Sequence, residues 1–142
     1  MEFIVKTFDE LTSRELYELY YLRVSVFVVE QKCAYQEVDE LDLKAFHLYL
    51  KEEGEIKAYL RILHNNDEAK IGRVISKKKG GGRAIMQYAL KYIYTRLNMS
   101  KISLEAQCCA QGFYEKFGFK SVGERFLEDG IWHIKMIKIE NI

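Results

Sequence analysis

The chain has 142 residues, of which 49% are hydrophobic and 30% are charged, a balance typical of a folded domain and not of a disordered chain. Its 22 basic and 21 acidic residues give a formal net charge of +1, so the basic excess of a dedicated nucleic-acid binder is absent. The odd count of three cysteines favours a reducing, cytoplasmic compartment, and no segment reaches the ~18 apolar residues of a membrane span. We therefore expect a single domain over residues 1–142, with no nucleic-acid or membrane partner.

The first half of the chain predicts a strand, a helix and three further strands. Residues 3–8 are strand-like, and Thr12 and Glu15 then have the spacing of a capping box. An apolar stripe at helical spacing follows. Residues 24–29 are β-branched enough to resemble a strand, but the preceding cap favours a helix. Three strand-like segments separated by turn signals come next, over residues 46–51, 56–63 and 69–76.

The second half predicts two helices, a strand and a β-hairpin. Gly118 is placed to close a short helix, and Asp129-Gly130 is among the strongest local hairpin signals. The order of all segments predicts an α/β chain (α+β) with a mixed sheet and helices on its faces. The segments are a helix over residues 83–98, a strand over 102–106, a helix over 110–117, and strands over 121–127 and 131–139.

A glycine-rich basic segment joins the fourth predicted strand to the following helix. Gly80, Gly81 and Gly82 lack a Cβ, so backbone N–H groups at the helix N-terminus are open to a ligand, and the helix dipole favours a phosphate there. A flexible, solvated loop is the equal alternative from composition alone. The segment lacks the Gly-Lys-Ser/Thr ending of the NTPase phosphate loop, and it lies too late in the chain for the dinucleotide fingerprint. The basic residues are Lys77, Lys78, Lys79 and Arg83.

Two motifs, together with the order of the elements, resemble the GNAT acetyltransferase superfamily. Residues 79–84, Lys-Gly-Gly-Gly-Arg-Ala, are similar to its pyrophosphate-binding motif Gln/Arg-x-x-Gly-x-Gly/Ala. Residues 107–119 are similar to its second motif, Asn-x-x-Ala-x-x-x-Tyr-x-x-x-Gly-Phe, with Gln107 in the place of Asn and Tyr114 at the tyrosine. The resemblance implies the GNAT fold, a single layer of about seven mostly antiparallel strands with helices on both faces.

A narrower resemblance, to the ElaA-like branch of this superfamily, covers nearly the whole chain. Arg73 and Lys79 are six positions apart, about two fewer than in that branch, so the loop would approach the cofactor by a shorter path. The positions that carry the resemblance are residues 23–31, Cys33, Tyr35, Asp39, Asp42, His47-Leu48, residues 72–74, Ala106-Gln107 and residues 128–134.

The resemblance implies acetyl-CoA as co-substrate and direct attack by an amine, without a covalent enzyme intermediate. Tyr114 would protonate the departing thiolate or donate a hydrogen bond to it, although a purely structural role in the core is the alternative. Pantetheine would lie against Val74 and Ile75. The implied cofactor-binding residues are Val74, Ile75, Lys79, Gly80, Gly81, Gly82, Arg83, Ala84 and Gln107.

The sequence leaves the general base and the acceptor open. A strand histidine beside an apolar residue, such as His47, is more often structural than catalytic. Neither Cys108 nor Cys109 shows a Cys–His pairing, and no metal-ligand spacing is present, so we expect no metal. We expect a small-molecule amine or a peptide N-terminus as acceptor, and a monomer or homodimer. Besides a water relay, the candidate bases are Glu30, Glu68, Glu105 and His133.

Two other functions remain as alternatives. One is a catalytically degenerate GNAT-fold module that binds CoA or a partner, which the short loop and the three glycines favour. The other is an RNA-associated protein that uses the basic patch at residues 77–79, which the near-zero net charge disfavours.

Overall fold

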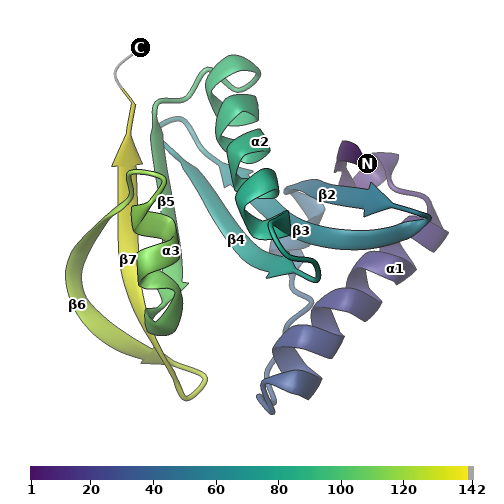
Figure 1. Ribbon diagram of the computed structural model, residues 1–142, viewed down its shortest axis with the longest axis horizontal. Helices are drawn as coiled ribbons and strands as arrows, with labels where there is room; N and C mark the ends of the chain where they lie inside the picture. The colour runs from purple at the N-terminus through teal and green to yellow at the C-terminus, as the bar shows by residue number, and fades with distance from the viewer. Residues whose placement is uncertain (141–142) are drawn as a thin grey trace.

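The computed structural model describes residues 1–140 and has seven strands in one sheet (Figure 1). Across the sheet their order is β1-β2-β3-β4-β5-β7-β6, and every neighbouring pair is antiparallel except β4–β5. The mixed, mostly antiparallel sheet expected from the sequence is therefore confirmed. The strands are β1 (Glu2–Thr7), β2 (Phe46–Glu52), β3 (Glu55–His64), β4 (Ala69–Ser76), β5 (Lys101–Gln107), β6 (Lys120–Glu128) and β7 (Ile131–Ile139).

Helices cover both faces of the sheet. Alternate strand residues point to opposite faces, and they divide the buried side chains into two groups. On one face, α1 (Ser13–Val24) and the π-helical turn η2 (Ser25–Glu30) pack against Tyr49 and Tyr59. On the other face, α2 (Gly81–Thr95) and α3 (Gln111–Glu115) pack on the larger apolar core (Figure 1). No helix within residues 1–140 is long and apolar enough to cross a membrane.

Local sequence signals predict the ends of several elements, and where the observed ends differ from the predicted ones the physical reason is local. The capping box is present, since Thr12 Oγ1 accepts from the Glu15 N–H at 3.1 Å and a Glu15 carboxylate oxygen accepts from the Thr12 N–H at 2.9 Å. The helix expected from residue 83 begins at Gly81 instead, because the left-handed residue that precedes it is Gly80, with φ of +80°. The helix expected over residues 110–117 covers only Gln111–Glu115, because a 3₁₀ turn (Cys108–Ala110) precedes it and the Phe117 and Gly118 N–H groups donate to carbonyls only three residues back.

The parallel pairing of β4 with β5 is short, and it creates the site. Only residues 69–71 of β4 pair with β5, so the two strands separate beyond Ile71. In the same part of β4 there is a β-bulge, with Arg73 in the left-handed region at φ of +55°. The edges of β4 and β5 that face each other beyond this point have no strand partner there, and they are available to a ligand.

Candidate active site

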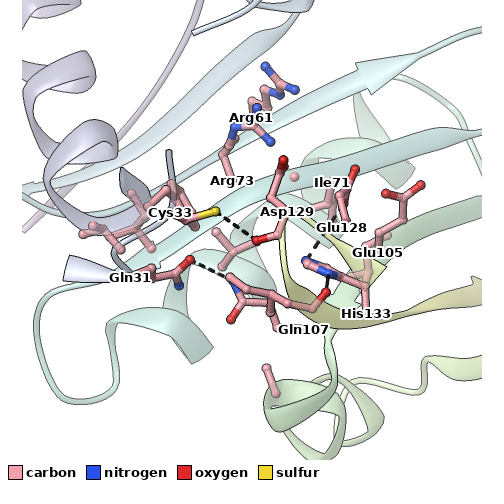
Figure 2. A pocket seen from close by; sticks show the side chains of 18 of the residues that line it. Gln31, Cys33, Arg61, Ile71, Arg73, Glu105, Gln107, Glu128, Asp129 and His133 are labelled. Atoms are coloured by element: carbon pink, nitrogen blue, oxygen red, sulfur yellow. Dashed lines mark hydrogen bonds and ion pairs between the residues drawn. The ribbon is translucent and has the colours of Figure 1, made fainter. Parts of the chain in front are cut away.

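A cavity of about 610 Å³ opens where β4 and β5 separate (Figure 2). Its lining includes Phe27, from η2 on one face of the sheet, and Tyr114, from α3 on the opposite face. The other walls come from β4, the end of β5, the segment that follows η2, and the β6–β7 hairpin. A ligand in this cavity can therefore contact groups from both faces of the sheet.

The structure places four of the expected site residues in this cavity and the others beside it. Val74 and Ile75 of β4, Gln107 at the end of β5, and Tyr114 line the cavity. The remaining residues, Lys79, Gly80, Gly81, Gly82, Arg83 and Ala84, lie outside the lining, in the loop after β4 and the first turn of α2.

The first turn of α2 has the features of an anion-binding site. No side chain caps this helix, and in the described part of the chain the Gly82 and Arg83 N–H groups have no protein acceptor. A Cβ on Gly81 would lie 2.9 Å from Ser76 Oγ and 3.0 Å from Lys78 Cγ, so a larger residue at that position would force these side chains to move. Unpaired amides together with the positive end of the helix dipole suit a phosphate.

The four basic side chains of this segment are not equivalent. Lys78 Nζ lies 2.7 Å from a Glu52 carboxylate oxygen, and Lys77 Nζ lies 3.7 Å from one of Glu30. Lys79 and Arg83 are exposed and, counting residues 1–140, have no ion-pair partner. Two positive charges therefore remain for a phosphate-bearing ligand, and in the basic patch of the RNA alternative, residues 77–79, two of the three lysines have ion-pair partners.

Tyr114 belongs to both the core and the cavity. Its ring packs edge-to-face on Phe113 and Phe119, with centroid distances of 5.1 and 6.3 Å, and only 8% of the residue is exposed. Burial raises the pKa of Tyr114 to about 12, so the phenol keeps its proton at neutral pH. Tyr114 therefore presents a protonated phenol, a hydrogen-bond donor, among the residues that line the cavity.

Three of the four candidate bases line the cavity, namely Glu30, Glu105 and His133, whereas Glu68 does not. His133 Nδ1 lies 2.8 Å from the Ile131 carbonyl oxygen, which can only accept, so Nδ1 carries a proton. In the neutral ring Nε2 is then the nitrogen with the free lone pair, and it lies 4.0 Å from a Glu128 carboxylate oxygen. His133 can therefore accept a proton at Nε2.

A buried network of charged side chains forms the wall behind the cavity. Arg23 Nη1 lies 2.7 Å from Asp42 Oδ1, and Arg23 Nη2 lies 2.9 Å from Glu37 Oε2. Arg61 pairs with Asp42 at 3.0 Å and Arg73 with Glu37 at 2.6 Å. The network is balanced in charge. Its members are Arg23, Arg61 and Arg73 against Glu37, Asp39 and Asp42.

Sequence reasoning missed Glu37 and Arg61 of this network and gave no role to its other members. A signal for Arg61 was present, because it interrupts the apolar strand segment 58–63 and a buried charge requires partners.

His47 contacts the same network: Nε2 donates to the Asp42 carbonyl oxygen at 2.9 Å, and Nδ1 accepts from the Tyr59 hydroxyl at 2.7 Å. Burial lowers the pKa of His47, so the ring is neutral and structural.

The sheet that opens between β4 and β5, beside a glycine-rich helix N-terminus, is the arrangement of a GNAT acyltransferase. The family model described as an acetyltransferase (GNAT) domain matches residues 12–140, and the chain belongs to this family.

Within the family, the chain is similar to ElaA-like proteins. Protein ElaA of Escherichia coli is 40% identical over 139 residues, which cover 92% of this chain and 91% of ElaA. A UPF0039 protein of Schizosaccharomyces pombe is 44% identical over 143 residues, which cover 96% and 95% of the two chains. The crystal structure of an acyl-CoA N-acyltransferase from Pseudomonas aeruginosa superposes with a TM-score of 0.91 at 41% identity, covering 97% of this chain and 99% of that one.

Proposed function

We propose that the protein transfers the acetyl group of acetyl-CoA to an amine in the cytoplasm. The observation that supports this best is the position of two sites at one end of β4. The cavity lies along Val74 and Ile75, and the uncapped N-terminus of α2 follows after a loop of four residues. An extended ligand with a thioester at one end and a pyrophosphate further along matches that arrangement.

The binding roles follow from the groups that have no protein partner. The Gly82 and Arg83 N–H groups, with the Lys79 and Arg83 side chains, would hold the pyrophosphate. The β4 backbone at Val74 and Ile75 would hydrogen-bond the pantetheine amides along the separated edge. Gln107 lies across the gap at the end of β5 and lines the same cavity.

Bound acetyl-CoA supplies an activated thioester, and the chain supplies proton transfer and positioning. His133 Nε2 would take the proton from the attacking ammonium, directly or through a water molecule. Tyr114 would donate a hydrogen bond to the departing sulfur. With a phenol pKa of about 12, full transfer to a thiolate of pKa ~8.5 is opposed by about 5 kcal/mol, so the proton stays on Tyr114.

The test has two stages. A ligand at a hundred times its dissociation constant adds about 2.7 kcal/mol to the stability of the fold, so saturating acetyl-CoA should raise the melting temperature. Release of CoA is then measured with a panel of alkylamines, polyamines and peptides with free N-termini. An unchanged melt would overturn the cofactor assignment. A raised melting temperature without CoA release for any acceptor in the panel would identify a binding module in place of an enzyme.

A further inference from the structure

A row of three residues crosses β3, β4 and β5 on the cavity side of the sheet. Arg61 pairs with Gly72, and Ile71 pairs with Leu104, so Glu105 is the next residue along β5. Ile71 and Leu104 face the core under α2, and because strand residues alternate, Gly72 and Glu105 face the opposite side. Arg61, between two residues of that core, faces the same way. By strand register, a guanidinium and a carboxylate therefore flank a position that has no side chain. Figure 2 shows Arg61 and Glu105 among the residues that line the cavity.

Among residues 1–140, one of the three guanidinium nitrogens of Arg61 has no hydrogen-bond acceptor. Its Nη1 donates to Asp39 and Asp42 and its Nη2 to Asp39, whereas Nε is buried and, within residues 1–140, has no hydrogen-bond partner. The side chain is only 6% exposed. A Cβ on Gly72 would lie 3.9 Å from this Nε, so the nitrogen lies above the glycine at the cavity wall. Leaving a buried N–H without an acceptor is unfavourable, and a ligand oxygen above Gly72 would remove that cost.

Arg73 adds a second, more accessible donor at the same wall. Its Nε and Nη2 bond to Glu37 and Asp39, and within residues 1–140 its Nη1 has no acceptor. Asp39 Oδ2 accepts from Arg61 Nη2 at 3.2 Å and from Arg73 Nη2 at 3.4 Å, so the two guanidinium groups converge on one carboxylate. Both side chains line the cavity.

The wall across the cavity is acidic. Glu105 Oε1 accepts from Lys70 Nζ at 3.1 Å, and Oε2 has no partner in the described chain. Glu128 and Asp129, at the tip of the β6–β7 hairpin, line the cavity and have no Lys or Arg partner among residues 1–140. The Cys33 thiol donates to the Asp129 carbonyl oxygen at 3.1 Å and fixes this tip against the segment after η2 (Figure 2). An ammonium group is favoured at this wall.

We propose that the acceptor is an α-amino acyl compound, recognised by its ammonium and by the adjacent carbonyl oxygen. The ammonium lies at the acidic wall, and the carbonyl oxygen accepts from Arg61 Nε or Arg73 Nη1 above Gly72. Arg61 and Glu105 lie on β3 and β5, at least roughly 10 Å apart between backbones because β4 and β5 separate beyond Ile71, and since both side chains line the same cavity one ligand can contact both. That the protein acetylates this amine rests on the proposed function. That the cavity binds an α-amino acyl compound does not.

The charge balance of the network selects among α-amino acyl compounds. Three arginines face three carboxylates, so the wall behind Gly72 has no net charge to neutralise a free carboxylate. A neutral carbonyl, as in a peptide N-terminus or an amino-acid amide, only needs the free N–H groups. Amides should therefore be preferred to free amino acids, and both to amines that lack the oxygen.

Matched trios of acceptors test this order with acetyl-CoA. One trio is phenylalaninamide, phenylalanine and 2-phenylethylamine, and another is leucinamide, leucine and 3-methylbutylamine. We expect kcat/KM for the amide to exceed that for the plain amine at least tenfold, with the free acid between them. Equal values for amide and amine in both trios would overturn the inference and leave the proposed function intact.

Gly72→Ala places a methyl group where the oxygen is expected. Its Cβ meets Arg61 Nε at 3.9 Å, an ordinary contact, so the variant should fold and bind acetyl-CoA as before. The preference for the amide over the amine should fall to within about threefold of unity. Gly112→Ala adds a methyl group with nothing within 4 Å and is the matched control, which should keep the preference. An unchanged preference in Gly72→Ala would overturn the inference.

A binding measurement separates recognition from catalysis. Phenylalaninamide is titrated calorimetrically into the protein–CoA complex, for the wild type and for Gly72→Ala. Binding that the variant weakens at least tenfold supports recognition, even where no amine is acetylated and the proposed function fails. If phenylalaninamide does not bind to the wild type although plain amines are acetylated, this inference is overturned and the proposed function is retained.

Discussion

Arg73 Nε and Glu37 Oε2 lie 2.6 Å apart, and this ion pair ties the bulge of β4 to the segment after η2. Arg73 Nη2 also donates to the Glu37 carbonyl oxygen at 2.9 Å. The same carboxylate pairs with Arg23 at the end of α1, so a single buried side chain connects α1 to β4. One wall of the cavity is therefore held in place by ion pairs, whereas apolar packing holds the rest of the fold together.

Glu37→Ala should be strongly destabilising, because it leaves two guanidinium groups without their shared partner. We expect a loss of about 3–5 kcal/mol in the free energy of unfolding, the usual cost of breaking a buried ion pair from one side. Arg73→Ala should cost less, because the Arg73 side chain is 21% exposed and Glu37 keeps Arg23. Urea unfolding of both variants tests the order, and an equal or reversed order would contradict this account of the network.

Gly80→Ala should weaken acetyl-CoA binding more than it weakens the fold. Gly80 has φ of +80° and nothing within 4 Å of an added Cβ, so the change adds backbone strain of about 1–2 kcal/mol without a clash. Gly54→Ala is the matched control, with φ of +77°, equal space and a position in the β2–β3 turn. Both variants should lose similar stability by urea unfolding, but only Gly80→Ala should bind acetyl-CoA more weakly in calorimetry. Equal affinities would mean that the loop does not hold the cofactor.

Tyr114→Phe should lower kcat by about tenfold and leave acetyl-CoA affinity nearly unchanged. The ring and its packing are retained, and only the hydroxyl is lost. The phenol pKa of about 12 favours a hydrogen bond over proton transfer to the sulfur, whereas general-acid catalysis would be worth roughly 10²–10⁴. Single-turnover kinetics at saturating acetyl-CoA measures the chemical step. A fall of a thousandfold would establish proton transfer, and an unchanged rate would remove Tyr114 from the mechanism.

Acid destabilisation should depend on Glu15. Burial opposes its ionisation, but hydrogen bonds from Lys6, Thr12 and Tyr49 outweigh this and lower the Glu15 pKa from 4.5 to about 2. A carboxyl group whose pKa is lowered by folding contributes stability that is complete above the unfolded value and is lost as the pH falls through the folded value. Glu15→Gln should thus be less stable than the wild type at pH 6, with a difference that shrinks between pH 4.5 and 2. Thermal melts across this range give the comparison, and a constant difference would contradict the assignment.

The features that the sequence predicted correctly are those with local causes. The Thr12–Glu15 capping box and the Asp129-Gly130 turn, with φ of +51° and +78°, need only neighbouring residues. The π-helical form of residues 25–30 and the partners of Arg61 depend on tertiary packing, so neither follows from periodicity. For the site, the resemblance located Val74, Ile75, Gln107 and Tyr114 at the cavity, but it did not identify the charged wall behind them.

The three-residue ladder between β4 and β5 also bears on how the molecule assembles. Strands β2, β3 and β4 pair in sequence order through short turns, and β6 and β7 form a hairpin, so both groups close over short stretches of chain. Ile71 and Leu104 can meet only after the whole of α2 has been brought across the sheet. Contacts of larger sequence separation pay more loop-closure entropy and tend to form later. The proposed ligand site thus lies at the boundary between these two groups of strands, and a ligand that binds both strand edges would stabilise the sheet as a whole.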